Sequence, residues 1–163
     1  MNEETSNGGF FVTLATFLLA IVLSQVPLSV QLQWYRPDWI LLVLMFWLMW
    51  APNRVGLLYA FSICVLLDLS RGSTLGIGAF SLTLIAYLVQ LSYRRLRVLP
   101  VSQQAFVVML LVSVNQLIFY FMQWLTGNLG DSLMFLMPAV ISAFAWPIVF
   151  ILLKNLARIM RLS

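Results

Sequence analysis

The sequence of 163 residues has no histidine, a single cysteine and only five acidic residues. Histidine is the commonest general base and the commonest transition-metal ligand, so its absence removes both roles. One cysteine, Cys64, excludes a disulfide framework or a thiolate metal cluster within one chain. Because carboxylates are also scarce, we expect no catalytic, cofactor-binding or metal-binding residue.

Charge of either sign is scarce too, since 9% of the residues are charged and 63% are hydrophobic. A soluble domain carries about 25% charged residues. A chain this apolar cannot form a water-facing surface, so the composition indicates an integral membrane protein. Buried backbone groups in lipid need internal partners, and strand-like alternation is absent, so we expect an all-α membrane fold. The net charge of +4 is mostly arginine that suits anionic lipid, and no nucleic-acid partner is expected.

Six apolar segments follow one another without a long linker or an internal repeat. They predict a single polytopic membrane domain over residues 1–163, a bundle of six transmembrane helices. The predicted helices lie at about 10–32, 37–51, 53–70, 75–93, 103–125 and 132–157. The leader MNEETSNGG is acidic and lacks Lys and Arg, so we expect the first segment to be retained rather than cleaved as a signal peptide.

The apolar cores of two segments, 39–51 and 55–69, are short for a membrane span. Thirteen residues reach only about 20 Å along a helix, against a hydrocarbon core of about 30 Å. Two interpretations stay open: two spans extended by their flanks, or a re-entrant hairpin that turns at 51–54. The charged flanks resemble interface anchors and favour two spans.

Basic residues are distributed unevenly between the two sides of the predicted bundle. Arg36 and Arg71 lie on one side, and seven basic residues lie on the other. The seven are Arg54, Arg94, Arg95, Arg97, Lys154, Arg158 and Arg161. Basic loops stay in the cytoplasm, so we predict that both termini are cytoplasmic. The acidic residues outside the N-terminal leader would then lie at the outer face.

The stretch Arg36-Pro37-Asp38 precedes a long uncharged run. Proline in the first turn of a helix and aspartate at its positive end are both favourable, so the stretch reads first as a helix start. That interpretation leaves Arg36 unexplained, because the predicted outer side is depleted of arginine. A second outer stretch, residues 66–80, also contains a charged residue whose position needs an explanation.

Asp68 lies near the C-terminal end of its predicted helix, where the helix dipole disfavours a carboxylate. It therefore needs a cation, and the candidates are Arg71 at i+3 and Arg36 across the helices. Gly72, Gly76 and Gly78 form the following turn and permit close backbone approach. These residues predict either a structural ion pair between helix ends or an outer docking or ligand site.

Polar side chains also recur at helical spacing inside the segments 75–93 and 103–125. In the first segment the positions are Ala79, Thr83, Ala86 and Gln90, and in the second they are Gln116, Tyr120 and Gln123, with Asn115 beside them. Such residues usually hydrogen-bond between helices, and a solute pocket is the alternative interpretation. We expect only neutral amides at mid-depth, which disfavours a carrier.

Three motifs together resemble the MreD family of rod shape-determining membrane proteins. They are RPDW (36–39), PNRVGLLYAFSICVLLDLSRGSTLG (52–76) and YRRLR (93–97). The resemblance covers nearly the whole chain. It implies a bacterial inner-membrane protein with a fold similar to the substrate-binding component of energy-coupling-factor transporters. It also implies partners: MreC, the glycosyltransferase RodA with a class B penicillin-binding transpeptidase, and the actin-like MreB at the cytoplasmic face.

The resulting expectation is a non-catalytic scaffold of cell-wall elongation with both termini in the cytoplasm. Its structural or partner-binding candidates are Arg36, Pro37, Asp38, Asp68, Arg71, Gly72 and Gly76. A small-solute or lipid carrier is the alternative. An enzyme is disfavoured by the missing histidine and the scarce carboxylates.

Overall fold

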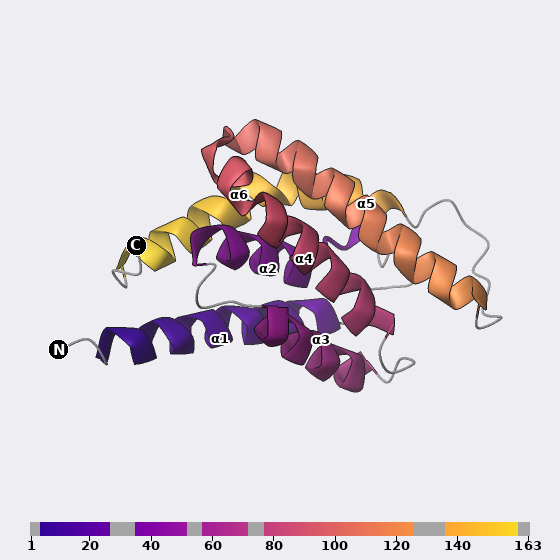
Figure 1. Cartoon of the computed structure of the whole chain (residues 1–163), viewed down its shortest axis with the longest axis horizontal. Coiled ribbons are helices and arrows are strands. Elements are labelled where there is room, and N and C mark those ends of the chain that lie inside the picture. Colours follow the sequence, from indigo (N-terminus) through magenta and orange to yellow (C-terminus); the bar gives the residue numbers. More distant parts are fainter. Residues whose placement is uncertain (1–3, 27–34, 52–56, 72–76, 126–135, 160–163) are drawn as a thin grey trace.

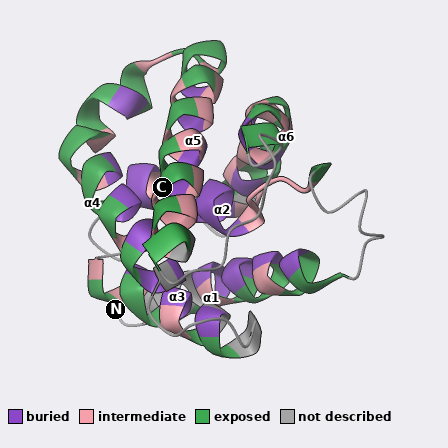
Figure 2. Ribbon diagram, turned by 90° about the vertical axis from the view of Figure 1, so that its right-hand side faces the viewer, coloured by how far each residue is buried: buried purple, intermediate pink, exposed green. Residues whose placement is uncertain are grey.

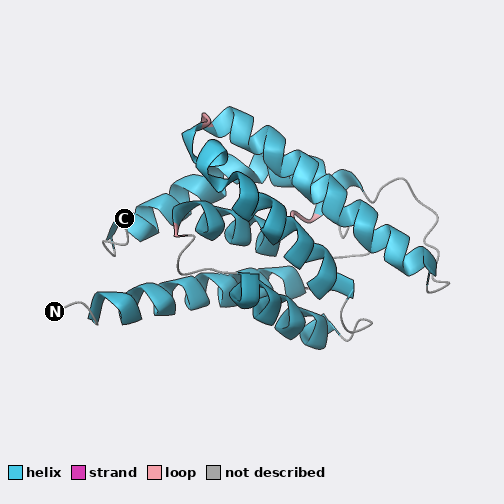
Figure 3. Cartoon of the chain, viewed as in Figure 1, coloured by secondary structure: helices cyan, strands magenta, loops and turns pink. Residues whose placement is uncertain are grey.

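The computed structural model describes residues 4–26, 35–51, 57–71, 77–125 and 136–159, and this part of the chain is almost entirely helical (Figure 3). The predictions of an all-α fold and of six helices are confirmed. The helices are α1 (Glu4–Gln25), α2 (Trp39–Trp50), α3 (Leu57–Arg71), α4 (Ile77–Val98), α5 (Val101–Leu125) and α6 (Met137–Ile159).

Prolines explain where two helices end. Helix α1 ends at Gln25 rather than near residue 32 as predicted, because Pro27 disfavours helical conformation in the residue before it. Helix α4 continues to Val98 instead of ending near residue 93, and the next proline is Pro100. The predicted boundaries at 52–56, 72–76 and 126–135 lie outside the described residues.

The start of α2 differs from the prediction by two residues. Pro37 and Asp38 precede the helix, and the Asp38 carbonyl accepts the first intrahelical hydrogen bond from the Leu42 N–H at 3.0 Å. Asp38 is therefore the N-cap residue, although its carboxylate makes no capping bond to its own helix. A hydrogen bond from Asn115 of α5 holds that carboxylate instead.

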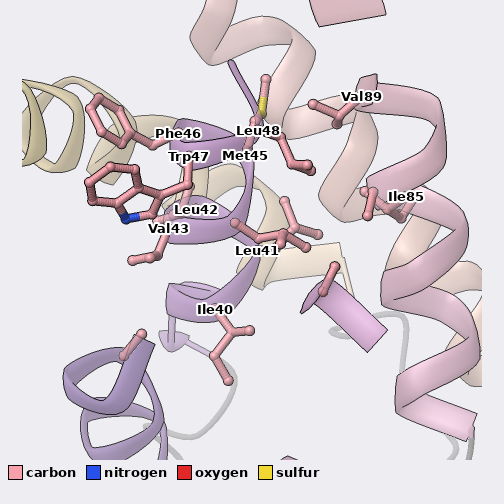
Figure 4. Close-up of a cluster of buried hydrophobic side chains, with 14 of the residues drawn as sticks. Ile40, Leu41, Leu42, Val43, Met45, Phe46, Trp47, Leu48, Ile85 and Val89 are labelled. Carbon is pink, nitrogen blue, oxygen red and sulfur yellow. The ribbon is translucent and has the colours of Figure 1, made fainter. Parts of the chain in front are cut away.

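Helix α2 is the centre of the bundle. All ten residues from Ile40 to Met49 are buried, and the helix contacts α1, α4 and α6 (Figure 2). The sequence explains this, because WILLVLMFWLMW has no polar face and a helix that is apolar all round is buried. Figure 4 shows Leu41 and Leu48 on the side of α2 that faces Ile85 and Val89 of α4, while Phe46 and Trp47 point to the opposite side. The one indole donor of Trp47 reaches Thr16 Oγ1 of α1 at 2.9 Å.

The outward faces of the surrounding helices are apolar. Leu19 of α1, Phe106 of α5 and Phe144 of α6 are each more than half exposed. In α5 and α6 the stretches Val101–Met122 and Met137–Arg158 are long and apolar enough to cross a membrane. The apolar parts of the first three helices are shorter, and α2 with its 12 residues is only about 18 Å long.

The choice between two spans and a re-entrant hairpin depends on residues 52–56, which lie outside the described part of the chain. Helix α3 packs mainly on α4, and α5 packs mainly on α6. The start of α1 and the end of α6 lie at the same end of the bundle (Figure 1). Consequently the end of α1 and the starts of α2 and α6 can meet at the other end.

Candidate functional site

Arg36 caps the end of the first helix. Its two terminal guanidinium nitrogens donate hydrogen bonds to the carbonyl oxygens of Ser24 and Val26. The last carbonyls of a helix have no intrahelical partner and carry partial negative charge, so a cation there is favourable. This contact explains why the chain keeps an arginine at this position.

Asp38 joins three helices. Its backbone N–H donates to Ser142 Oγ of α6 at 2.9 Å. Its Oδ2 accepts a hydrogen bond from Asn115 Nδ2 of α5 at 3.0 Å. Because Asp38 itself begins α2, these two bonds fix the central helix against α5 and α6.

Asp68 is buried, with 2% of its surface exposed, and lies against the start of the next helix. Its Oδ2 accepts a hydrogen bond from the Ala79 N–H at 3.0 Å. Ala79 is in the first turn of α4, where backbone N–H groups lack intrahelical partners and the helix dipole is positive. The carboxylate that is disfavoured at the end of α3 is thus favoured at the beginning of α4.

Gly78 allows this contact. A Cβ built on Gly78 would lie 3.1 Å from Asp68 Cγ and closer still to the Oδ1 of the same side chain. Any larger residue would displace the carboxylate from α4. The other two predicted turn glycines, Gly72 and Gly76, lie outside the described residues, as does the side chain of Arg71.

The described contacts give Arg36 and Asp68 different partners from those predicted. Each charge is held by backbone groups at the end of a helix. Asp68 also makes a further interaction beyond the Ala79 contact. The direct pairing of Arg36 with Asp68 therefore stays a prediction, and a double-mutant cycle can test it.

A cavity of about 180 Å³ lies beside these residues. Trp39, Leu82 and Phe119 form part of its apolar wall. Its polar lining comes from three helices, α1, α4 and α5, and from the segment before α2: Ser24, Arg36, Asp38, Ser81, Asn115 and Gln116. The structure thus brings Arg36, Pro37 and Asp38 to one cavity, with Asp68 behind its Gly78 wall.

Asn115 stands out in this lining. It is 7% exposed, and within the described part of the chain its Oδ1 has no hydrogen-bond partner. A buried polar atom without a partner costs about 1–3 kcal/mol. Such atoms are uncommon in folded proteins, and one that lines a cavity suggests a ligand.

The cavity lies deeper than the sequence predicts. At 1.5 Å per residue, Asn115 is only about 5 Å from the middle of the apolar stretch Val101–Met122. Asp38 bonds to it there, so a carboxylate lies beside an amide well inside this stretch. The expectation of neutral amides alone at mid-depth was wrong, because α2 is short and begins inside the bundle.

Several residues of the site are hard to recognise from the sequence as site residues. Ser24, Ser81 and Ser142 carry weak signals, since serine is common in membrane helices and bonds its own backbone. Asn115 carries a stronger signal, because an amide in an apolar run usually faces another helix. That interpretation is confirmed by its bond to Asp38. Within the described residues, no group of three or more His, Cys, Asp or Glu side chains could hold a metal ion.

Comparison with known proteins gives the family. The family model for rod shape-determining protein MreD matches residues 4–156. The chain belongs to the MreD family. A curated MreD relative, the rod shape-determining protein MreD of Haemophilus influenzae, is 32% identical over 153 residues, which cover 94% of each chain. No solved structure matches the chain. The MreD resemblance of the motifs is thereby confirmed, and with it a role in rod shape determination.

Proposed function

We propose that this MreD-family protein is a non-catalytic membrane scaffold of cell-wall elongation. In this role it binds an MreC-like membrane protein and organises the peptidoglycan synthase formed by RodA and a class B penicillin-binding transpeptidase. The observation that supports a scaffold is the use of the charged residues. Arg36 binds the carbonyls at the end of α1, and Asp68 binds an amide at the start of α4. Both charges stabilise helix ends.

The proposed partner-binding surface is the end of the bundle around the candidate site. The candidate residues, which contribute to partner binding either by contact or by holding helix ends, are Arg36, Pro37, Asp38, Asp68, Arg71, Gly72 and Gly76. Because Asp38 fixes α2 against α5 and α6, a change there would alter the shape of this end. Contact with MreB is proposed for the opposite, basic end, which also suits anionic lipid.

Co-purification tests the scaffold. A tagged chain extracted from native membrane should recover MreC, and Gly78→Ala should recover less of it, since displacing Asp68 disturbs this end of the bundle. The control is Ser113→Ala, which removes one hydroxyl that bonds only within α5, to the Met109 carbonyl at 2.8 Å. Full MreC recovery by Gly78→Ala, together with an unchanged melting temperature, would argue against this surface.

The proposed topology is six spans in the bacterial inner membrane, with both termini cytoplasmic. The exposed apolar side chains of the outer helices support it, as does the common end that holds the start of α1 and the end of α6 (Figure 1). A fold similar to the substrate-binding component of energy-coupling-factor transporters belongs to the same proposal.

Thiol labelling tests this topology. Cysteines placed at Asn2 and Ser163, in a Cys64→Ser background, should resist a membrane-impermeant thiol reagent in intact cells and react after permeabilisation. Cys64 is buried, so serine there removes background labelling with little change to the surface. Labelling of either terminus in intact cells would contradict the six-span arrangement.

A second candidate function is the binding of a small solute or a lipid headgroup. The cavity favours it, because a carboxylate meets an amide oxygen that has no hydrogen-bond partner among the described residues, and both lie inside an apolar stretch. Ionisable groups at membrane depth are costly and usually mark a binding site or a pathway.

A further inference from the structure

A row of three aromatic rings at the basic end of the bundle carries a cation at each of its ends. Trp50 of α2 stacks on Phe46 with ring centroids 5.8 Å apart, and Phe46 meets Phe150 of α6 edge to face, also at 5.8 Å. The Arg97 guanidinium carbon lies 5.3 Å from the Trp50 ring centroid, and Lys154 Nζ lies 5.7 Å from the Phe150 ring centroid. Both distances are within the range of a cation–π interaction. The row therefore links α2 and α6 to the last turn of α4.

These ring contacts hold two positive charges in place without using their N–H groups. A cation above a ring interacts with the π electrons, so its N–H groups remain available to acceptors. Within the described residues, neither Arg97 nor Lys154 forms a hydrogen bond or an ion pair. The carbonyls at the end of α4 accept from Gln104 instead. Arg97 thus differs from Arg36, whose terminal nitrogens bind the end of α1.

The surroundings of the two cations are accessible and basic. Arg97 is exposed, Lys154 is partly exposed, and Arg95 in the same turn of α4 is exposed as well. Asp38 and Asp68, the two acids whose side chains the structure describes, lie around the cavity at the opposite end. The complementary ligand of this surface is therefore an anion.

Exposed apolar side chains adjoin both cations. Val98 follows Arg97 in the chain, and Ile151 precedes Lys154 by three residues, which makes them neighbours on the surface of α6. Val98 and Ile151 are both more than half exposed. Lipid tails are as apolar as leucine and cover such side chains. A phospholipid therefore fits the cations and the apolar faces together, whereas inorganic phosphate fits the cations alone.

We propose that Arg97 and Lys154 bind phosphate groups of an anionic phospholipid and that the aromatic row positions the two cations for it. A guanidinium that stacks on a ring keeps its planar fork of N–H groups, which matches two phosphate oxygens. This inference rests on the proposed contact of the basic end with anionic lipid, and it names the residues that make that contact.

Lipid retention tests the site. The protein is reconstituted in nanodiscs with equal amounts of phosphatidylglycerol and phosphatidylcholine that have the same acyl chains. It is then extracted into detergent at about 0.5 M salt, which screens charges that do not touch the lipid. Mass spectrometry should show phosphatidylglycerol retained over phosphatidylcholine by about twentyfold, since each cation contributes about fivefold. Equal retention of both lipids would overturn the proposal.

Matched charge variants assign the preference to the two cations. Arg97→Gln and Lys154→Gln should each lower it about fivefold. Arg95→Gln removes the same charge from the same turn of α4, but Arg95 makes no cation–π contact among the described residues. It should lower the preference less than about twofold at this salt concentration. Equal losses in Arg95→Gln and Arg97→Gln would show that net charge alone attracts the lipid, and would overturn the site.

Variants of Trp50 test the aromatic row while both cations remain. Trp50→Leu removes the ring under Arg97 and should lower the preference about threefold, whereas Trp50→Phe keeps a ring and should keep most of it. Melting temperatures identify variants that do not fold. An unchanged preference in folded Trp50→Leu, or its loss in folded Trp50→Phe, would show that the ring does not position Arg97. If Trp50→Leu does not fold, Trp50→Phe and the charge variants decide.

A small anion and a protein are the alternative occupants. A higher melting temperature in phosphate than in chloride at equal ionic strength, without any preference among lipids, would identify a small-anion site and overturn the lipid. Loss of MreB recovery in Arg97→Gln with an unchanged lipid preference would assign the surface to that protein and also overturn the lipid.

The test separates this site from the proposed function. Nanodiscs present the same lipids on both faces, so the preference does not depend on which end of the bundle is cytoplasmic. Recovery of MreC is measured for the same wild-type protein. Recovery of MreC without a lipid preference overturns the lipid site alone, and a lipid preference without recovery of MreC overturns the scaffold alone.

Discussion

Helix α5 carries two buried side-chain amides, Gln104 and Asn115, which differ in their hydrogen bonding. Gln104 is 3% exposed, and both ends of its side chain are engaged. Its Nε2 donates to the carbonyls of Leu96 and Leu99, each at 3.1 Å, and its Oε1 accepts from Trp146 Nε1 at 3.3 Å. Gln104 thus caps the end of α4 and ties it to α5 and α6.

Asn115, eleven residues further along the same helix, is 7% exposed and only half engaged. Its Nδ2 bonds to Asp38, while its Oδ1 has no partner in the described part of the chain. Asn115 lines the cavity beside Arg36 and Asp38, whereas Gln104 does not. The comparison shows that burial alone does not separate a structural amide from a binding amide; the pairing of every donor and acceptor does.

The two amides also divide the bundle into a closed end and an open end. At the closed end, the Pro100 carbonyl accepts from the N–H groups of Gln103 and Gln104, and the turn from α4 to α5 is tight. At the open end, Arg36 and Asp68 hold helix ends around a cavity. We therefore expect substitutions at the closed end to affect stability most.

The largest expected effect is that of Gln104→Leu. It leaves two carbonyls and the indole N–H of Trp146 without this partner, which should lower the free energy of unfolding by about 3 kcal/mol. Asn115→Leu is the matched control and should cost only about 1 kcal/mol, since it also removes an oxygen that has no partner in the described part of the chain. Unfolding in nanodiscs measures both. Equal losses of unfolding free energy in the two variants would contradict the proposed difference between Gln104 and Asn115.

Next in size is Gly78→Ala at the open end. The added Cβ overlaps the Asp68 carboxylate, and such overpacking costs about 1–3 kcal/mol. Removing the carboxylate removes the overlap, so Gly78→Ala combined with Asp68→Ala should lose less than the sum of the single variants. Unfolding of all four proteins measures this coupling, and strictly additive losses would show that the overlap is relieved elsewhere.

A smaller effect is expected for Ser142→Ala. The Asp38 N–H loses its acceptor on α6, which should cost about 1 kcal/mol. Ser113→Ala, whose hydroxyl bonds only within its own helix, should cost less. Melting temperatures in one detergent compare the two variants. A larger loss for Ser113→Ala would show that Asp38 does not hold the open end together.

The smallest expected effect is the coupling free energy between Arg36 and Asp68, measured by a double-mutant cycle. If helix-end groups hold the two charges independently, the losses in Arg36→Ala and Asp68→Ala should add within about 0.5 kcal/mol in the double variant. A direct ion pair predicts a double variant that loses clearly less than the sum. The unfolding free energies of the four proteins decide between these explanations.

Several features of the protein follow from the sequence alone. The uncharged run after Asp38 predicts a helix, and its lack of any polar face explains why α2 is buried on all sides. Pro27 explains the end of α1 at Gln25. The motifs around Arg36, Asp68 and YRRLR are sufficient to indicate the MreD family.

The partners of the charged residues were decided only by the tertiary structure. The sequence shows that Asp68 lies at an unfavourable helix end, but its described partner is a backbone amide of α4. Arg36 likewise binds backbone carbonyls of α1. Every residue except proline carries a backbone N–H and a carbonyl, so such partners have no signature in the sequence. The packing of the helices determines which of their ends, and which buried amide, lie within reach of a charge.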